Sequence, residues 1–478
     1  MPAVLSAPRR GAGAFWKILV IGLGTLVVPL DSSVNVGFPA IVARFGLAIP
    51  EIQWIVIAYV LTQTSLLLIF GRIADMLGYR RVFLAGCACG AVAFGLCSVA
   101  TSYEFLLFGR VMQGVGAGLV LSSGPALLTS LFPETERARV LGIYTMIFGI
   151  GGALGLLVAG VLVAVYGWSV IFWYRAPLSA LAFLAVLVLL PSAPHRPEED
   201  GGGEGAERQR FDALGALLLA GSIAATLFSF NRMPFATEQP VLFGACVLAA
   251  VGGFAFFIAQ QNRVTQPIIN LRHFRNADFS LINAAHSLVQ LAGFSINLLG
   301  PFFLSRIAGL STPESGLVLA MSSMGIILAA PAAGRLAGRI SAERLCLVGM
   351  GCVVLGQVGI TFGIGRAGIG WIAAAFLLQG IGVGTFQAAY LDVVTATLPR
   401  AERGVAGALG MLTRTFGTVC GATLLMLAFS TARDGAQAAG AAAPEALLQG
   451  LRVGFGCAAV IPAAVMAVLL ARGGRWLR

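Results

Sequence analysis

Long apolar runs separated by short polar segments dominate this chain. Each run holds about twenty residues, and a helix of that length crosses the roughly 30 Å hydrocarbon core of a bilayer. The predicted ranges are 15–41, 52–71, 82–100, 104–130, 138–165, 168–190, 213–231, 241–260, 278–305, 314–337, 345–364, 369–392, 403–430 and 447–471. The pattern therefore predicts an all-α membrane protein of fourteen transmembrane helices in the order six, two, six.

The most hydrophilic segment, 195–210, divides this pattern. It is rich in Gly and Glu, as flexible linkers are. We therefore expect an N-terminal six-helix bundle over 1–190 and a cytoplasmic linker over 191–212. Two inserted transmembrane helices over 213–262 and a C-terminal six-helix bundle over 263–478 complete the prediction.

Basic residues are divided unevenly between the two ends of these helices. Of the 31 Lys and Arg residues, few fall in the segments of one side, and these are Arg44, Arg232, Arg306, Arg366 and Arg433. Cytoplasmic segments of membrane proteins carry the excess of positive charge. We therefore expect both termini in the cytoplasm and the protein in the cell's inner (plasma) membrane.

Composition agrees with this class, since 58% of residues are hydrophobic and 11% are charged, whereas soluble domains hold about a quarter charged residues. The net charge of +11 comes from basic residues that stand singly or in pairs between apolar runs, so we expect no nucleic-acid partner. The 8 cysteines lie in apolar runs without metal-ligand spacing. We expect neither a metal nor a cofactor nor an enzyme, and a monomer in the lipid bilayer.

Two motifs of the first half recur in the second. GRIADMLGYRR at 71–81 returns as GRLAGRISAER at 334–344, and QGVGAG at 113–118 returns as QGIGVG at 379–384, at nearly constant spacing. The two six-helix halves are therefore predicted to be parallel repeats. Repeats of this kind place a substrate site at their interface, near the middle of the membrane.

These motifs resemble those of the major facilitator superfamily. GRIADMLGYRR matches the superfamily's signature between helices 2 and 3, while LDSSVNVGFPAI at 30–41 and RVMQGVGAG at 110–118 resemble signatures of its fourteen-helix drug:proton antiporter branch. The resemblance implies proton-driven export of small amphipathic compounds by alternating access, with protons and a small-molecule substrate as partners. It also implies a gating role for Gly71, Asp75, Gly78, Arg80 and Arg81.

Two positions depart from the pattern of that branch. The helix-5 signature normally contains Gly-Pro, but Leu156 stands where the proline is expected. In the sixth helix, WYRAP places Arg175 where the family usually carries Asn. The first departure concerns the bending of helix 5, and the second suggests an altered substrate preference.

Asp31 lies inside the first predicted helix. A carboxylate at that depth is costly, and such residues usually mark ion or proton pathways. Arg110, in the fourth helix, lies a similar distance from the outer membrane face at ~1.5 Å per residue. Because arginine stays charged in essentially any environment, it can hold Asp31 deprotonated until a proton or substrate competes. We assign proton coupling to Asp31 and Arg110, with a purely structural buried pair as the alternative.

Several other polar residues in predicted helices are candidates for the substrate cavity. His286, Gln290 and Asn297 share one helical face, which either lines the cavity or forms hydrogen bonds between helices. Arg175 and Arg414 must face a cavity or a partner; with Arg110 they outnumber Asp31, which favours anionic or neutral ligands. Asp392 is read as a helix-end residue rather than a second proton site. The candidates are Asn35, Gln113, Arg175, His286, Gln290, Asn297 and Arg414.

Glycines crowd the fifth predicted helix and indicate close helix packing; these are Gly151, Gly152, Gly155 and Gly160. Two other functions remain open beside multidrug-type efflux. One is dedicated export of an endogenous metabolite or an anionic compound. The other, more distant, is a proton-pumping subunit of a respiratory complex, which the absence of a buried lysine disfavours, since Lys17 stands near the start of the first predicted helix.

Overall fold

A computed structural model describes residues 10–190, 212–232, 239–264, 271–336, 339–397 and 405–472, and these residues form helices and their connections without a strand. Of the linker predicted over 191–212, only Asp212 lies among the described residues. The all-α prediction is confirmed.

Twelve helices of the described part are long and apolar enough to cross a membrane. A pair bent by 117°, Phe38–Phe45 with Ile49–Leu67, raises the number to as many as 13. A further helix, α10 (Ala213–Arg232), carries a shorter apolar stretch, Leu217–Thr226. The chain is thus a multi-pass membrane protein, and the number fourteen stays a prediction.

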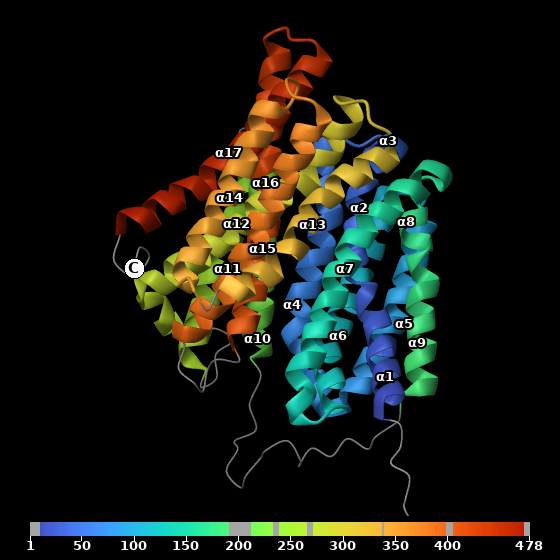
Figure 1. Ribbon diagram of the computed structural model, residues 1–478. Coiled ribbons are helices and arrows are strands. Elements are labelled where there is room, and N and C mark those ends of the chain that lie inside the picture. Colours follow the sequence, from blue (N-terminus) through green and yellow to red (C-terminus); the bar gives the residue numbers. More distant parts are fainter. Residues whose placement is uncertain are drawn as a thin grey trace, which may run out of the picture.

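The N-terminal half occupies one side of the molecule, blue to green in Figure 1. Its elements are α1 (Arg10–Leu26), η1 (Pro29–Ser32), α2 (Ser33–Val36), α3 (Phe38–Phe45), η2 (Ile49–Ile52), α4 (Gln53–Leu77), α5 (Tyr79–Ser98), α6 (Tyr103–Ser130), α7 (Glu134–Tyr166), α8 (Val170–Trp173) and α9 (Arg175–Leu189).

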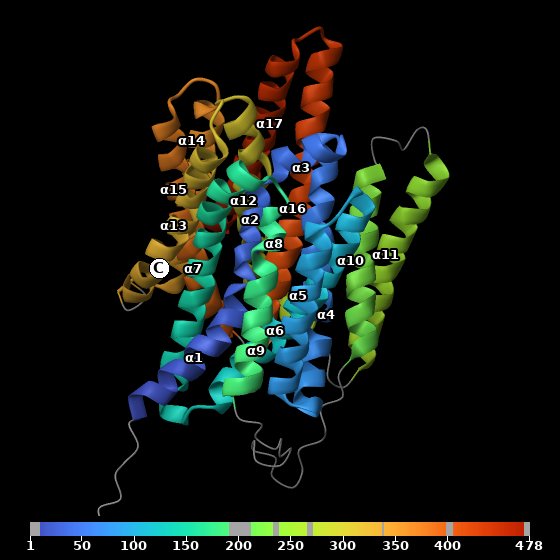
Figure 2. The ribbon, with the colours of Figure 1, turned by 90° about the vertical axis from the view of Figure 1, so that its right-hand side faces the viewer.

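The C-terminal half lies beside it, and the hairpin of α10 and α11 (Pro240–Arg263) stands at the edge of the molecule in Figure 2. In this hairpin α10 packs on α4 and α16, and α11 contacts η4. The remaining elements are η4 (Leu271–Arg275), α12 (Ala277–Arg306), α13 (Thr312–Leu336), α14 (Ala342–Gly363), α15 (Ile369–Thr397), α16 (Val405–Ala438) and α17 (Ala443–Arg472).

The first and sixth membrane helices each contain one apolar span, Trp16–Val36 and Val170–Leu189, within the predicted ranges 15–41 and 168–190. A short interruption of the regular α-helix, termed a break, lies inside each of them. The first divides into α1, η1, α2 and α3. Pro29 opens η1, and proline removes a backbone donor and disrupts helical pairing. The sixth divides into α8 and α9 at Tyr174. Each break brings a charged residue, Asp31 or Arg175, to a point where helical geometry is interrupted.

The repeated motifs make equivalent helix contacts in the two halves. A Cβ atom on Gly116 would lie 2.8 Å from the backbone nitrogen of Gly90 in α5. A Cβ atom on Gly382 would lie 2.5 Å from the backbone nitrogen of Val353 in α14. Each motif therefore lets its helix approach the preceding one to backbone contact.

Helix α7 joins the two halves by packing on α13. A Cβ atom on Gly316 would lie 2.7 Å from the carbonyl oxygen of Leu156, and one on Gly160 would lie 3.1 Å from that of Thr312. Leu156, where the antiporter branch has proline, is buried, and α7 runs as one helix through it. The halves thus meet closely along the part of α7 that contains Leu156 and Gly160.

The other helix-5 glycines face the break in the first helix. A Cβ atom on Gly151 would lie 2.6 Å from Cγ of Pro29, and one on Gly155 would lie 2.9 Å from the carbonyl oxygen of Leu30. Gly152 has open space beside its Cα, but its carbonyl oxygen accepts a hydrogen bond of 2.7 Å from Ser32. This packing fixes η1, and with it the backbone of Asp31.

Candidate functional site

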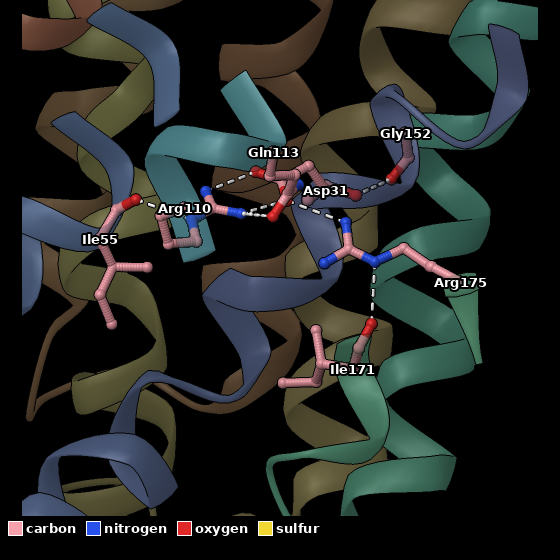
Figure 3. Close-up of polar contacts among 8 residues, drawn as sticks. Asp31, Ile55, Arg110, Gln113, Gly152, Ile171 and Arg175 are labelled. Carbon is pink, nitrogen blue, oxygen red and sulfur yellow. Dashed lines mark hydrogen bonds and ion pairs between the residues drawn. The ribbon is translucent and has the colours of Figure 1, made fainter. Parts of the chain in front are cut away.

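Asp31 is the centre of a charged cluster in the first half (Figure 3). Its Oδ1 accepts hydrogen bonds from Nη1 of Arg110 at 2.6 Å, Nη1 of Arg175 at 2.8 Å and Nε2 of Gln113 at 2.7 Å. Its Oδ2 accepts a fourth from Nη2 of Arg110 at 2.8 Å. One carboxylate from the break in helix 1 thus binds side chains from α6 and α9.

Arg110 is 0% exposed, and protein groups surround its side chain. Its Nε donates to the carbonyl oxygen of Ile55 in α4 at 2.9 Å, and its Nη1 also contacts Oε1 of Gln113 at 2.7 Å. Its guanidinium lies 4.4 Å from the ring centroid of Tyr59, a favourable cation–π arrangement. Two nitrogen atoms of the Arg110 guanidinium donate to the two carboxylate oxygens of Asp31. The single ammonium group of lysine could not form this pair of parallel bonds.

Arg175 is the second fully buried cation of the cluster, also 0% exposed. Its Nε donates to the carbonyl oxygen of Ile171 at 2.8 Å, and its guanidinium lies 4.6 Å from the ring centroid of Phe94. Its Nη2 is buried and has no hydrogen-bond partner among the described residues. Sequence spacing showed no carboxylate near Arg175; the fold supplies Asp31, which is remote in the chain.

The cluster combines two cations with one anion and so carries an excess positive charge. The Asp31 side chain is 14% exposed, whereas both arginine side chains are fully enclosed. A small pocket lined by Gly24, Tyr59, Gln113 and Ser179, among others, adjoins it. The carboxylate is therefore the member of the cluster that water can reach, and it is a group able to gain or lose a proton. Sequence reasoning missed Tyr59, since only tertiary structure brings α4 against Arg110.

The polar stripe of α12 forms hydrogen bonds to α16. Nδ1 of His286 lies 2.7 Å from Oγ1 of Thr413, and its Nε2 lies 3.1 Å from Nε2 of Gln290. The His286 ring is stacked on Tyr390 of α15, with the ring centroids 4.0 Å apart. Both residues are buried; His286 bonds to the neighbouring helix α16, whereas the bond of Gln290 lies within α12.

The remaining cavity candidates differ in their exposure. Gln113 is buried in the Asp31 cluster, and Asn35 is buried in α2. Asn297 is half-buried in α12. Arg414 of α16 is exposed although it lies on a membrane helix. The structure thus unites Asp31, Arg110, Gln113 and Arg175 in one cluster and leaves Arg414 outside it.

The profile of the Major Facilitator Superfamily matches residues 21–422 and 282–473. The chain belongs to the major facilitator superfamily. Its members are transporters, so this protein is a membrane transporter and not an enzyme. Among the described residues, no group of three or more His, Cys, Asp or Glu side chains could hold a metal ion.

Curated relatives in this superfamily match most of the chain. The Riboflavin transporter RibZ of Clostridioides difficile (strain 630) is 25% identical over 82% of this chain and 83% of its own length. The Multidrug resistance protein Stp of Mycobacterium tuberculosis is 29% identical over 85% and 74%. The Tetracenomycin C resistance and export protein of Streptomyces glaucescens is 28% identical over 88% and 77%.

Solved structures support the fold. A bacterial homologue of the human lysosomal transporter Spinster, in an inward-facing and unoccupied conformation, superposes with a TM-score of 0.67 at 15% identity, covering 96% of each chain. A POT family transporter in complex with 5-aminolevulinic acid gives a TM-score of 0.68 at 14% identity, covering 100% of this chain and 98% of that one.

The signature between helices 2 and 3 forms a tight turn at the ends of α4 and α5. Gly78 has φ of 94°, a conformation that residues with a side chain rarely adopt. The hydroxyl of Tyr79 donates to Oδ1 of Asp75 at 2.9 Å, and Nη2 of Arg80 donates to the carbonyl oxygen of Leu187 in α9 at 2.9 Å. Asp75 and Arg81 are exposed, and Gly71 is half-buried. The turn thus ties α4 and α5 to the end of α9.

Proposed function

We propose that this transporter exports small amphipathic compounds in exchange for protons, and that Asp31 carries the proton. The single observation behind the proposal is the pairing of Asp31 with two fully enclosed arginines, at 2.6 and 2.8 Å. The names of relatives, among them a multidrug resistance protein and a resistance and export protein, support export as the direction of transport.

The cluster suggests how protonation drives a conformational change. In the arrangement described, both guanidinium groups bind the ionised carboxylate of Asp31. Protonation cancels that charge and leaves two buried cations without a counter-ion, which is an unfavourable state. Rearrangement of the broken helices 1 and 6 lets water or substrate reach these cations and relieves the cost. Loss of the proton restores the cluster, so proton movement and helix movement are linked.

The proposal also includes the topology and the gate. Fourteen crossings, with the linker over 191–212 and both termini in the cytoplasm of the plasma membrane, fit the distribution of basic residues. The turn of Gly71, Asp75, Gly78, Arg80 and Arg81 serves as the gate, because it ties the ends of α4, α5 and α9 together. The protein acts as a monomer.

The test is uptake into inverted membrane vesicles driven by a pH gradient. Three fluorescent probes cover the substrate classes: ethidium as a cation, Nile red as a neutral compound and fluorescein as an anion. We expect wild-type protein to concentrate at least one probe and Asp31→Asn to lose this uphill uptake while retaining downhill exchange. The matched control is Asp392→Asn, which removes an exposed carboxylate near the end of α15.

All variants are compared at equal amounts of folded protein. If Asp31→Asn concentrates the probe as well as wild type, Asp31 is not the proton carrier. A loss in Asp392→Asn together with normal uptake by Asp31→Asn would move the proton path into the second bundle. If wild-type protein concentrates none of the three probes, multidrug-type export is refuted.

A further inference from the structure

Arg414 is a cation without a partner on a membrane helix. It is exposed in α16, and no hydrogen bond or ion pair joins it to another residue in the part of the chain that the structure describes. A charged side chain within a membrane faces the bundle interior or a water-filled cavity, because lipid does not solvate it. Its exposure therefore indicates a space that water can enter.

The depth of Arg414 excludes contact with lipid headgroups. The next residue, Thr415, forms a hydrogen bond of 2.8 Å with Thr64 of α4. Thr64 lies close to the midpoint of α4 (Gln53–Leu77), more than about 15 Å from either end of that helix at ~1.5 Å per residue. An arginine at that level cannot extend to the membrane surface, so its partner must come from inside the protein.

The direction of the side chain follows from its neighbours on the helix. Thr413 and Gly417 face α12, where Ser287 Oγ donates to the carbonyl oxygen of Thr413 at 3.1 Å, and Thr415 faces α4. At about 100° per residue, α12 and α4 lie on opposite sides of α16, and Arg414 projects between these two directions. Phe416 points the opposite way. Since Arg414 interacts electrostatically with Tyr59 of α4 and His286 of α12, its side chain lies on the side that is directed between the two halves of the molecule.

Both halves of the molecule lie within electrostatic range of Arg414. Its charge acts on Tyr59 of α4 and on His286 of α12. Tyr59 is the residue whose ring contacts Arg110 of the Asp31 cluster. A ligand bound at Arg414 would therefore lie near both bundles and near the proton-coupling residues.

The helix segment that carries Arg414 is rigidly fixed on two sides. Thr413 is bonded to His286 at 2.7 Å and lies 3.4 Å from the hydroxyl of Tyr390, and Thr415 is bonded to Thr64. His286 is itself stacked on Tyr390. A rigid backbone with a free guanidinium is suited to binding, since little order has to be created when a ligand arrives.

We propose that Arg414 anchors a binding site, in the space between the two bundles, for the anionic group of an amphipathic organic acid. The guanidinium offers a planar fork that fits a carboxylate with two parallel hydrogen bonds. The excess positive charge of the Asp31 cluster adds to the attraction. The site rests on the proposed function and narrows it, because it selects organic anions among the small amphipathic compounds.

The test measures binding, which needs no pH gradient. Purified protein in lipid nanodiscs is titrated by calorimetry with naphthalene-2-carboxylate and with naphthalene-2-carboxamide, which has nearly the same shape but no charge. Wild-type protein is expected to bind the carboxylate at least about tenfold more tightly than the amide. Arg414→Gln should abolish this preference, and Arg414→Lys should keep part of it, because an ammonium retains the charge but lacks the fork.

The matched control is Arg433→Gln, which removes a cation from the same helix where it is paired with the exposed Asp434 at 2.7 Å. This variant should keep the preference of the wild type. Equal binding of both probes by wild type, binding of neither, or a preference that survives Arg414→Gln would each overturn the site.

The uptake assay separates this proposal from the proposed function. Arg414-dependent binding of the carboxylate without any gradient-driven uptake refutes proton-coupled export and leaves the anion site standing. Gradient-driven uptake of ethidium or Nile red that Arg414→Gln does not change, together with equal binding of the two naphthalene probes, refutes the anion site and leaves export standing.

Discussion

Removal of the charge on Asp31 should cost more stability than removal of the charge on Arg175, and the two costs should not add. The Asp31 carboxylate is the shared counter-ion of two arginines that are fully enclosed. Asp31→Asn leaves both cations buried without it, and breaking a buried ion pair costs about 3–5 kcal/mol. The unfolding free energy of Asp31→Asn should fall by that amount, even though the Asn side chain preserves the shape.

Arg175→Gln should be milder. It loses one hydrogen bond to a carboxylate, about 1.5–3 kcal/mol, together with the bond to the carbonyl oxygen of Ile171 and the contact with the ring of Phe94. It also removes the excess positive charge and a buried Nη2 without a partner in the described part of the chain, so the net loss should be about 1–2 kcal/mol. In the double variant only Arg110 remains as an uncompensated cation. The double variant should therefore be more stable than the sum of the single losses predicts, by about 1–3 kcal/mol, as for other residues in contact.

The assay is unfolding in mixed micelles with increasing sodium dodecyl sulfate, followed by tryptophan fluorescence, for wild type, both single variants and the double variant. Arg433→Gln is the control, and loss of its exposed pair should cost no more than about 1 kcal/mol. Additive losses would refute the shared ion network. The guanidinium of Arg175 lies 4.6 Å from the ring centroid of Phe94 and 5.3 Å from that of Phe172. A loss in Arg175→Gln as large as that in Asp31→Asn would show that Arg175 acts through packing on these rings rather than through charge.

Two further predictions concern the gate and the topology. Asp75→Asn should lower the transport rate while leaving the affinity for a bound probe nearly unchanged. Asp75 accepts a hydrogen bond from Tyr79 in the turn, and this turn lies far along α4 from Tyr59. Loss of probe binding in a protein that still changes conformation would contradict the gating role. Reporter fusions after Pro194 and after Arg478 should both report the cytoplasm, and a signal from the opposite side at either point would contradict the fourteen-helix topology.

The sequence determined the class of this protein. Runs of about twenty apolar residues with few charges form helices in the membrane. Lipid cannot form hydrogen bonds with backbone N–H and C=O groups, and a helix satisfies these groups within the segment. The recurring motifs at 71–81 and 334–344 indicated two related halves, and in the structure the glycines of the other repeated motif, Gly116 and Gly382, make equivalent contacts. Such features are local in the chain, so they can be read without knowledge of the fold.

The depth of single residues in the membrane could also be predicted from the sequence. A count of residues from the helix ends put Asp31 and Arg110 at one level, and they are in contact in the structure. The same count could not show that the first helix breaks at Pro29, nor that Asp31 lies in the resulting turn. Whether a single proline kinks a helix or interrupts it depends on the helices that pack around it.

Only the tertiary structure decided which partners the charges have. Arg175 and Arg414 looked alike in the sequence, as arginines inside apolar helices with no acid nearby. The fold brings Arg175 to 2.8 Å from Asp31 and leaves Arg414 exposed. The difference arises because the neighbour that each side chain of a membrane helix contacts depends on how the helices rotate and pack.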